Sequence, residues 1–240
     1  MVKWIEGWLK NRTSVVRVNG FKSSTFKVTS GVPQGSVLGP LLYILYVNDM
    51  PLCIKNANCR LYADDTLLGM DITDCGQGAL QSNVTQLCDW STKWGMNFNP
   101  SKCMHMEVGR NLPNFKLFMN GVAIPQTSNI KYLGVFIQSD LKWHHHIQNI
   151  VNKSNKTLFM MIRCLFNTSC KTKMIAFNTV VRPVLEYASQ VWSPHTKALI
   201  DQIERIQRRV VRWTFKLEKL DSVSECMEAN SVAKLEKRRS

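Results

Sequence analysis

The spacing of apolar residues changes once along the chain, from short alternating runs to long helical periods after Asp140. Residues 4–9 place their apolar side chains on one face and predict a short helix at the amino terminus. Residues 15–21 and 25–28 are rich in β-branched and aromatic side chains, which predicts two strands around an Asn19–Gly20 turn. We expect this hairpin to support the loop that follows it.

Two further elements of the first half follow from runs of apolar residues. Residues 37–47 are apolar on every side, a pattern typical of a buried helix, and Asn48–Pro51 ends that helix. The apolar arms on either side of Asp64 and Asp65 predict a β-hairpin with both carboxylates at its tip.

The next segment, residues 76–94, has apolar side chains at helical spacing and predicts an amphipathic helix. We assign its Leu87, Trp90 and Trp94 to the hydrophobic core rather than to a stacking surface for nucleic acid, because aromatic stripes usually pack inside. Several later runs predict strands, the second and third of them joined by an Asn-Gly turn: residues 104–108, 115–119, 122–124 and 131–137.

After Asp140 the pattern is helical. It predicts helices over residues 141–161, residues 173–192 with a break at Pro183, and residues 195–216. In the last helix the apolar residues share one face: Leu199, Ile203, Ile206, Val210 and Trp213. The other faces carry arginines: Arg205, Arg208, Arg209 and Arg212. The fold class predicted for the whole chain is α+β, with a mixed domain over residues 1–140 and an all-helical domain over residues 141–240.

The charge is distributed unevenly. The chain has 240 residues, enough for a sizeable core, and a net charge of +14. Residues 1–30 contain six basic residues (Lys or Arg) and one acidic residue (Asp or Glu), and residues 31–150 contain eight of each. Residues 151–200 contain seven basic residues and one acidic residue, and residues 201–240 contain ten basic and seven acidic residues. A neutral centre between basic flanks suits an enzyme that holds a phosphate backbone around a metal site.

Other patterns exclude several classes of protein. The eight cysteines form no Cys-x-x-Cys pair, which argues against a zinc site or a disulfide framework. The best apolar run is too short to span a bilayer, so we expect no membrane partner. His144–His146 cannot converge on one metal ion from a helix, and we assign them to a polar helix face.

Asp64 and Asp65 interrupt an otherwise apolar run. Like charges this close repel and each resists desolvation, so folding alone explains them poorly. A divalent cation such as Mg²⁺ removes both costs, because it binds carboxylate oxygens. The alternative is a solvated Asp-Asp turn between two strands, which is the better interpretation of the dipeptide by itself. The sequence upstream reverses that preference.

Residues 30–40 read Ser-Gly-Val-Pro-Gln-Gly-Ser-Val-Leu-Gly-Pro and open the apolar helix. Gly35 allows backbone to approach a ligand closely, and Ser36 can cap the helix. This loop and the Asp64–Asp65 hairpin, in this order and at this spacing, resemble the palm of reverse transcriptases. The resemblance is strongest to the non-LTR retrotransposons of the jockey and chicken-repeat kind, and it extends through essentially the whole chain.

The resemblance implies a partial polymerase palm, an antiparallel sheet with packed helices, over residues 1–140. Over residues 141–240 it implies an all-helical, thumb-like region, which includes the motif at residues 181–187. The implied reaction is template-directed nucleotidyl transfer by two-metal-ion catalysis. The implied partners are an RNA template, a DNA primer and deoxynucleoside triphosphates. The family implies an intracellular protein, nuclear or cytoplasmic, and leaves its protein partners unknown.

The resemblance also assigns roles to residues of the palm. Asp64 and Asp65 become ligands of Mg²⁺. The nucleotide and template pocket is lined by Pro33, Gln34 and Gly35, with Ala63 beside the primer end.

Lys102 stands where the family has a proposed general acid toward the pyrophosphate leaving group. A surface lysine in a turn explains Lys102 equally well, because nothing in the sequence favours proton donation near neutral pH.

Residues 131–137 resemble the primer grip, in which a hairpin supports the primer end, and its candidate residues are Tyr132, Leu133 and Gly134. A palm strand without nucleic-acid contact is the alternative. The implied contacts to the nucleic-acid backbone are Lys171, Lys173, Arg205, Arg208, Arg209 and Arg212. A solvated basic face that keeps a helical bundle soluble is the alternative there.

One part of the family's site is missing. Reverse transcriptases complete the metal cage with an aspartate from an earlier strand, but no Asp precedes Asp49 here, and Glu6 is the only acid before Ser30. We therefore expect an amino-terminally truncated reverse transcriptase domain with an incomplete two-ion site, inactive as an isolated chain. The alternative is a catalytically inactive, nucleic-acid-binding remnant of such an element.

Overall fold

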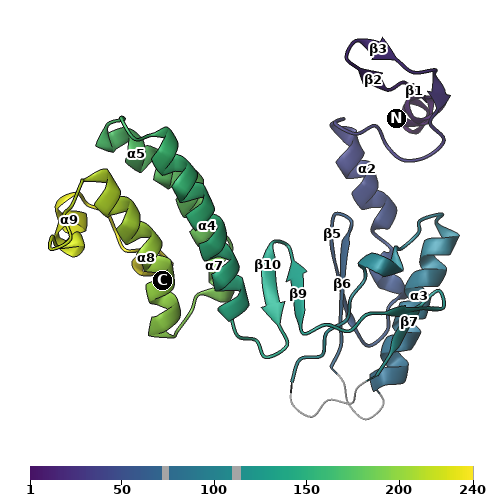
Figure 1. Cartoon of the computed structure of the whole chain (residues 1–240). Coiled ribbons are helices and arrows are strands. Elements are labelled where there is room, and N and C mark those ends of the chain that lie inside the picture. Colours follow the sequence, from purple (N-terminus) through teal and green to yellow (C-terminus); the bar gives the residue numbers. More distant parts are fainter. Residues whose placement is uncertain (72–75, 110–114, 240) are drawn as a thin grey trace. The chain divides into compact units, whose positions relative to one another are not determined.

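The computed structural model describes residues 1–71, 76–109 and 115–239, which form two compact units (Figure 1). Unit 1 comprises Met1–Cys103 and Phe115–Ile124, and unit 2 comprises Met104–Asn114 and Pro125–Ser240. The predicted boundary after residue 140 differs from this division, because the strands just before it share a hydrophobic core with the helices that follow.

The amino-terminal segment contains the predicted helix and turn, with shorter strands than expected. Helix α1 spans Val2–Leu9. Asn19 and Gly20 have φ of +48° and +88° and form a two-residue turn. The strands are only two residues long: β1 (Thr13–Ser14), β2 (Arg17–Val18), β3 (Phe21–Lys22) and β4 (Phe26–Lys27). The predicted pairing is wrong, because the tight turn pairs β2 with β3 at once and leaves β4 to pair with β1.

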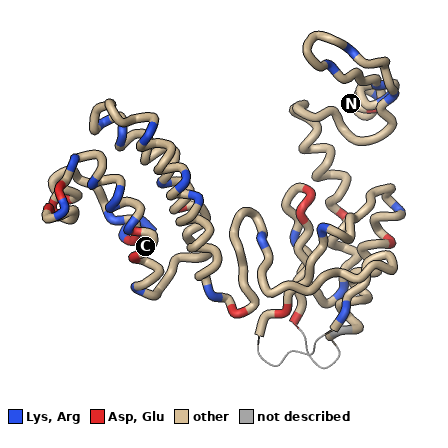
Figure 2. Tube along the Cα trace, in the orientation of Figure 1, with Lys and Arg blue, Asp and Glu red and all other residues tan. Residues whose placement is uncertain are grey.

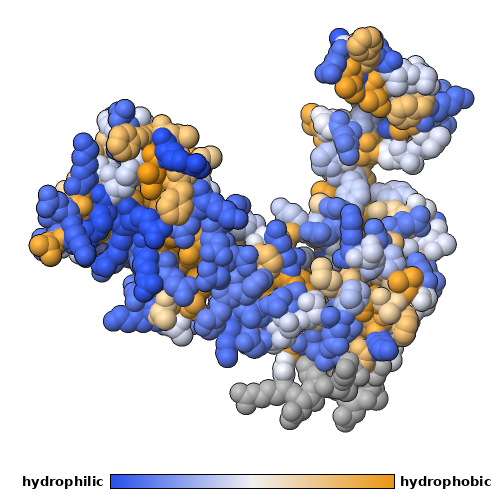
Figure 3. Space-filling model, viewed as in Figure 1, coloured by the Kyte–Doolittle hydropathy of each residue, from blue (hydrophilic) through white to orange (hydrophobic). Residues whose placement is uncertain are grey.

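Helix α2 (Leu38–Val47) ends at Asn48, as predicted, and is followed by the 3₁₀-helix η1 (Met50–Cys53). Its predicted burial is wrong. Only Gly39 and Val47 are buried in α2, whereas three of its large apolar side chains are more than half exposed: Leu41, Ile44 and Leu45. Figure 3 shows further apolar residues at the surface of the amino-terminal segment. Val18 and Phe21, in β2 and β3, are both exposed.

The remaining part of unit 1 packs around helix α3 (Gly76–Lys93). One face of α3 contacts η1 and the hairpin formed by β5 (Asn58–Tyr62) and β6 (Asp65–Gly69). The other face packs on β7 (Leu117–Met119) and β8 (Val122–Ile124). The core assignment is confirmed for Leu87 and Trp90. It is wrong for Trp94, which follows the end of α3 and is 36% exposed.

Asn120 and Gly121 form the predicted tight turn between β7 and β8, with φ of +50° and +77°. The predicted strand over residues 104–108 is wrong, because only His105 pairs there, in a single bridge to Gln126. All strands of the described residues pair in two-stranded antiparallel ladders, so the expected larger sheet is not present among them. The fold is therefore mixed, with helices and small antiparallel ladders, which is compatible with an α+β polymerase fragment.

The two strands described in unit 2 form a hairpin where one strand was predicted. Strands β9 (Asn129–Tyr132) and β10 (Val135–Gln138) pair across a turn at Leu133 and Gly134, with φ of +45° and +85°. Gly134 accounts for the difference, because a glycine at positive φ allows a reversal inside an otherwise continuous strand pattern.

Helices make up most of the rest of unit 2: α4 (His144–Cys164), α5 (Cys170–Ala176), η3 (Phe177–Val181), α6 (Arg182–Glu186), α7 (Ser189–Trp192), α8 (Lys197–Thr214), α9 (Val223–Ala229) and α10 (Leu235–Arg239). Helix α4 begins three residues later than predicted. The apolar face of α8 faces the core, with Leu199, Ile203, Ile206 and Val210 buried. No helix in the described ranges is both long enough and apolar enough to span a bilayer.

The predicted break at Pro183 lies elsewhere. Helix continues from Cys170 to Glu186, because the five-residue π-helix η3 widens the turn before Pro183 and Pro183 then occupies the first turn of α6. The chain instead breaks at Tyr187 and Ala188, where Ala188 has a left-handed φ of +53°.

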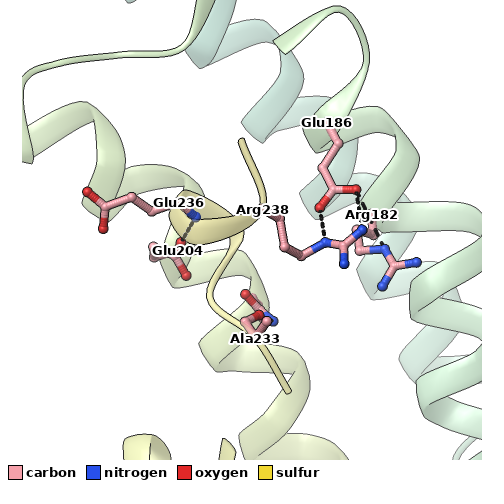
Figure 4. A network of polar contacts seen from close by, with 7 residues as sticks. Arg182, Glu186, Glu204, Ala233, Glu236 and Arg238 are labelled. Atoms are coloured by element: carbon pink, nitrogen blue, oxygen red, sulfur yellow. Dashed lines mark hydrogen bonds and ion pairs between the residues drawn. The ribbon is translucent and has the colours of Figure 1, made fainter. Parts of the chain in front are cut away.

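The carboxy-terminal helix α10 is joined to α6 and α8 by polar contacts (Figure 4). Glu186 accepts a hydrogen bond of 2.6 Å from Arg238 and pairs with Arg182 at 3.7 Å. The backbone N–H of Glu236 donates to Glu204 at 2.7 Å. These contacts join the end of α6, the middle of α8 and α10 around the same core.

Candidate active site

Asp64 and Asp65 lie at the tip of the β5–β6 hairpin. Tyr62 pairs with Asp65, which leaves Ala63 and Asp64 as the two-residue turn. Both carboxylates are exposed, and no hydrogen bond or ion pair within the described part of the chain occupies their oxygens. Figure 2 shows acidic residues at this tip. The predicted position of the two carboxylates is confirmed, and their oxygens are available to an external cation.

The turn holds Ala63 in an unfavourable conformation. Its φ is +50°, a left-handed value that costs a non-glycine residue about 1 kcal/mol. Five paired positions in the ladder below the turn keep it in place. Strain of this kind is common where a chain must present particular side chains, and here it presents Asp64.

Helix α2 lies close to the tip. The pKa of the Tyr43 hydroxyl in α2 is raised by its burial, and the negative charge of Asp64 raises it further. Because α2 starts directly after the Pro33–Gly35 loop, the same helix extends from that loop toward the carboxylates. No described contact joins the loop directly to Asp64 or Asp65.

The loop itself is a tight turn. Ser36 N–H donates to the carbonyl of Pro33 at 3.4 Å, with Gly35 at φ +80°, and Gln34 and Gly35 are exposed. The Ser36 hydroxyl accepts from the N–H of Gly39 at 3.0 Å, so Ser36 satisfies a donor in the first turn of α2, although the N-cap residue itself is Val37. Gly39 is also required for space, because a Cβ there would lie 2.8 Å from the Ser36 Oγ.

Arg12 connects the amino-terminal ladders to the loop. Its guanidinium donates to the carbonyl of Ser30 at 3.1 Å and also to the carbonyl of Gly31. Arg12 lies just before β1 and outside the predicted hairpin, so the expectation that the hairpin itself supports the loop stays a prediction.

Lys102 ends the 3₁₀-helix η2 (Pro100–Lys102), which is capped by the side chain of Asn99. Lys102 is exposed, and no contact within the described residues joins it to the hairpin tip. Its role as a general acid stays a prediction.

The candidate primer-grip residues lie at the β9–β10 turn of unit 2. Gly134 is exposed there, while Tyr132 and Leu133 are half-buried. The side chain of Tyr187 contacts this turn, with its hydroxyl donating to the carbonyl of Leu133 at 3.0 Å. Tyr187 was recognised only as part of a motif, because no local pattern relates a residue in a helix break to a turn so far away in sequence.

His146 is buried, contrary to its predicted place on a polar helix face. Its ring lies 5.0 Å from the ring of Trp192, and its Nδ1 accepts from the N–H of Phe136 at 3.2 Å. Burial lowers the pKa of His146 below its ordinary value. The positive charge of a histidine is disfavoured at this site, which fits the role of a neutral acceptor.

The candidate phosphate-binding residues of unit 2 differ in how exposed their side chains are. Lys171, Arg205, Arg208 and Arg209 are exposed, and Figure 2 shows basic positions along α4, α5 and α8. Arg212 is half-buried and donates to the carbonyls of Glu218 and Asp221.

Lys173 does not fit its predicted role. It is only 3% exposed, and its Nζ lies 4.6 Å from the ring centroid of Trp213. A buried ammonium over an aromatic face is not presented to a phosphate.

The donor set at the tip fits a divalent cation in part. Two adjacent carboxylates with free oxygens match the ligand preference of Mg²⁺. Among the described residues, however, no group of three His, Cys, Asp or Glu side chains is arranged to hold a metal ion. Asp64 and Asp65 would thus hold such a cation from one side only.

Comparison with known proteins agrees with these features. A family model described as reverse transcriptase (RNA-dependent DNA polymerase) matches residues 1–137. The chain is 28% identical over 220 residues to the probable RNA-directed DNA polymerase from transposon X-element of Drosophila melanogaster. It is also 28% identical, over 224 and 223 residues, to the RNA-directed DNA polymerases from mobile element jockey of Drosophila melanogaster and Drosophila funebris.

Each of these alignments covers 87% of the chain and 24% of the relative. The chain therefore spans about a quarter of the length of the curated relatives it matches. The expected resemblance to reverse transcriptases of non-LTR retrotransposons is confirmed by the family match and by the names of these relatives. The chain belongs to the reverse transcriptase (RNA-dependent DNA polymerase) family.

Proposed function

We propose that the chain is part of a reverse transcriptase of a non-LTR retrotransposon and supplies two of the carboxylates for RNA-directed DNA synthesis. The substrates are an RNA template, a DNA primer and deoxynucleoside triphosphates. The observation that carries this proposal is the exposed Asp64–Asp65 pair at the tip of a tight hairpin, with its carboxylate oxygens free.

The proposed chemistry needs little from the protein beyond position and charge. In nucleotidyl transfer, divalent cations neutralise the charge that develops on the attacking and leaving oxygens. Asp64 and Asp65 would hold them, and the strained Ala63 turn keeps both carboxylates at the surface. The exposed backbone of Gln34 and Gly35 is suited to line the nucleotide and template pocket.

We assign unit 1 to the palm, the β9–β10 hairpin to the primer grip, and the helices of unit 2 to the thumb. The support is their chain order together with the family match over residues 1–137. Exposed Lys171, Arg205, Arg208 and Arg209 would contact phosphates without reading sequence.

Metal binding tests the role of the hairpin tip. We expect Mn²⁺, followed by its paramagnetic resonance signal, to bind the 240-residue chain, and Asp64→Asn or Asp65→Asn to weaken binding about tenfold or more, since each removes a charged ligand. Asp89→Asn is the matched control, because Asp89 is an exposed carboxylate on α3 of the same unit. If Asp64→Asn and Asp89→Asn bind Mn²⁺ as the unchanged chain does, the hairpin tip is not a metal site.

Primer extension tests whether the site is complete. We expect the 240-residue chain with Mg²⁺ to extend a DNA primer on an RNA template no faster than its Asp64→Asn variant, because no third ligand completes the site within the described residues. The products are resolved on a sequencing gel. Mg²⁺-dependent extension above the Asp64→Asn level would show that the two carboxylates suffice and would reject the incomplete site.

The second candidate function is a catalytically inactive remnant that binds nucleic acid through unit 2. The absence of a three-ligand group among the described residues favours it. The two candidates differ in metal binding: a remnant binds duplexes but binds Mn²⁺ equally well with and without Asp64.

A further inference from the structure

The β9–β10 turn is held by a side chain from far along the chain. The hydroxyl of Tyr187 donates to the carbonyl of Leu133 at 3.0 Å. The Tyr187 ring also packs on Gly134, where an added Cβ would lie 3.2 Å from the ring Cε1. Gly134 has φ +85°, so the turn needs glycine for its conformation and for the approach of this ring. Tyr187 therefore contacts both residues of the turn.

Tyr187 is itself fixed by the break that carries it. Its N–H donates to the carbonyl of Pro183 at 3.0 Å, and the next residue, Ala188, has φ +53°. The carbonyl of Tyr187 accepts a 2.7 Å hydrogen bond from the indole N–H of Trp192. Trp192 has no exposed surface, so the backbone of Tyr187 is anchored to the core.

Trp192 is also connected to the hairpin through His146. The Trp192 ring lies 5.0 Å from the His146 ring, whose Nδ1 accepts the N–H of Phe136 in β10. A continuous series of contacts therefore runs from Leu133 through Tyr187, Trp192 and His146 to Phe136, and both of its ends lie on the β9–β10 hairpin. A turn held at two points in this way has a fixed orientation relative to the helices of unit 2.

Folding alone does not explain the tyrosine hydroxyl. Tyr187 is 57% exposed, so water can satisfy its hydroxyl when the hydrogen bond to the Leu133 carbonyl is absent. What the hydrogen bond adds is position, because it favours one orientation of a turn in which Gly134 is exposed.

We propose that Tyr187 is a positioning residue for primer binding: it orients the Leu133–Gly134 turn so that this turn holds the 3′-terminal nucleotide of a DNA primer. The inference rests on the proposed function, in which the β9–β10 hairpin is the primer grip. Phosphate contacts elsewhere in unit 2 provide most of the affinity, and the turn provides the placement of the primer end.

The test uses the 240-residue chain and an RNA–DNA hybrid with 2-aminopurine either at the primer 3′ end or at an internal position. We expect the unchanged chain to alter the fluorescence of the terminal probe. Tyr187→Phe removes one hydrogen bond and should lower the equilibrium constant for the oriented turn about fivefold, with a partial loss of the terminal signal. Tyr187→Ala, which also removes the ring, should abolish it. Hybrid affinity and the internal probe should stay the same.

Tyr46→Phe is the matched control. Tyr46 is another exposed tyrosine whose hydroxyl donates to a backbone carbonyl, that of Trp94 in unit 1, and its loss should leave the terminal signal unchanged. Tyr187→Phe keeps the ring against Gly134, so the test does not depend on Tyr187→Ala folding.

The failures of the two proposals are distinguishable. If the unchanged chain binds no hybrid, or affects both probes alike, the primer-grip function fails and this inference fails with it. If the terminal signal is specific but persists in Tyr187→Phe and Tyr187→Ala, only the role of Tyr187 is rejected. A Tyr187→Phe variant that loses hybrid affinity and thermal stability in proportion to the signal would show a purely structural role and also reject the inference.

Discussion

Binding of an RNA–DNA hybrid to the chain is expected to weaken about 150-fold between 50 and 200 mM salt, if four exposed cations of unit 2 each neutralise one phosphate. The candidates are Lys171, Arg205, Arg208 and Arg209. Each contact releases counterions and contributes about −0.9 to the log–log slope of affinity against salt, so four give about −3.6. A random-sequence DNA duplex should bind similarly, because phosphate contacts carry no sequence information. Fluorescence anisotropy at several salt concentrations measures the slope.

Single substitutions refine this result. Arg205→Ala should reduce the slope by about 1, whereas Arg205→Lys should leave it unchanged, because the slope counts charges and not their shape. Lys116→Ala is the control, since Lys116 is an exposed cation of unit 1. A hybrid affinity that does not fall with salt, or a slope unaltered by Arg205→Ala, would contradict the assignment of α8 as a backbone-binding helix.

Replacement of Trp192 by alanine is expected to lower the free energy of unfolding by about 3–5 kcal/mol, as for other large buried side chains. Trp192 is completely buried, donates a hydrogen bond to Tyr187 and contacts the ring of His146. Alanine would leave a cavity and an unpaired carbonyl at the break between α6 and α7. Urea unfolding followed by circular dichroism measures the change.

Val191→Ala provides the comparison for Trp192→Ala. Val191 is the neighbouring residue in α7 but is 60% exposed, so its truncation should change the unfolding free energy by less than about 0.5 kcal/mol. Equal effects of the two substitutions would mean that Trp192 does not anchor the bundle. Trp192→Phe, which keeps an aromatic ring, should fall between the two.

The sequence allowed good prediction of the elements whose signal is local. The Asn19–Gly20 and Asn120–Gly121 turns were correctly placed, because asparagine and glycine tolerate the positive φ that tight hairpins require. The Asp64–Asp65 hairpin was correctly placed because two charged side chains inside an apolar run resist burial and can stay in solvent at the tip of a hairpin. For α8, the face of a long helix follows from its period alone.

Features that depend on distant partners could not be predicted. The Leu133–Gly134 turn lacks the Asn-Gly signature, and the side chain that contacts it, Tyr187, lies 54 residues further along the chain. His146 looks polar in sequence but is buried because Phe136 and Trp192 surround it. Pro183 predicts a break, yet a π-helix before it accommodates the ring. In the same way, the burial of Lys173 follows from the position of Trp213, on another helix.

The exposed apolar side of α2 has a consequence for the colloidal behaviour of the chain. Leu41 and Ile44 are exposed, and Leu45 lines an open hollow of about 450 Å³ together with Tyr46 and Trp94. Such a surface favours self-association, while mutual repulsion between molecules of charge +14 opposes it. Added salt screens the repulsion but does not weaken the apolar attraction. The salt concentrations that are expected to weaken the proposed nucleic-acid binding are therefore those in which the molecules have the greatest tendency to aggregate.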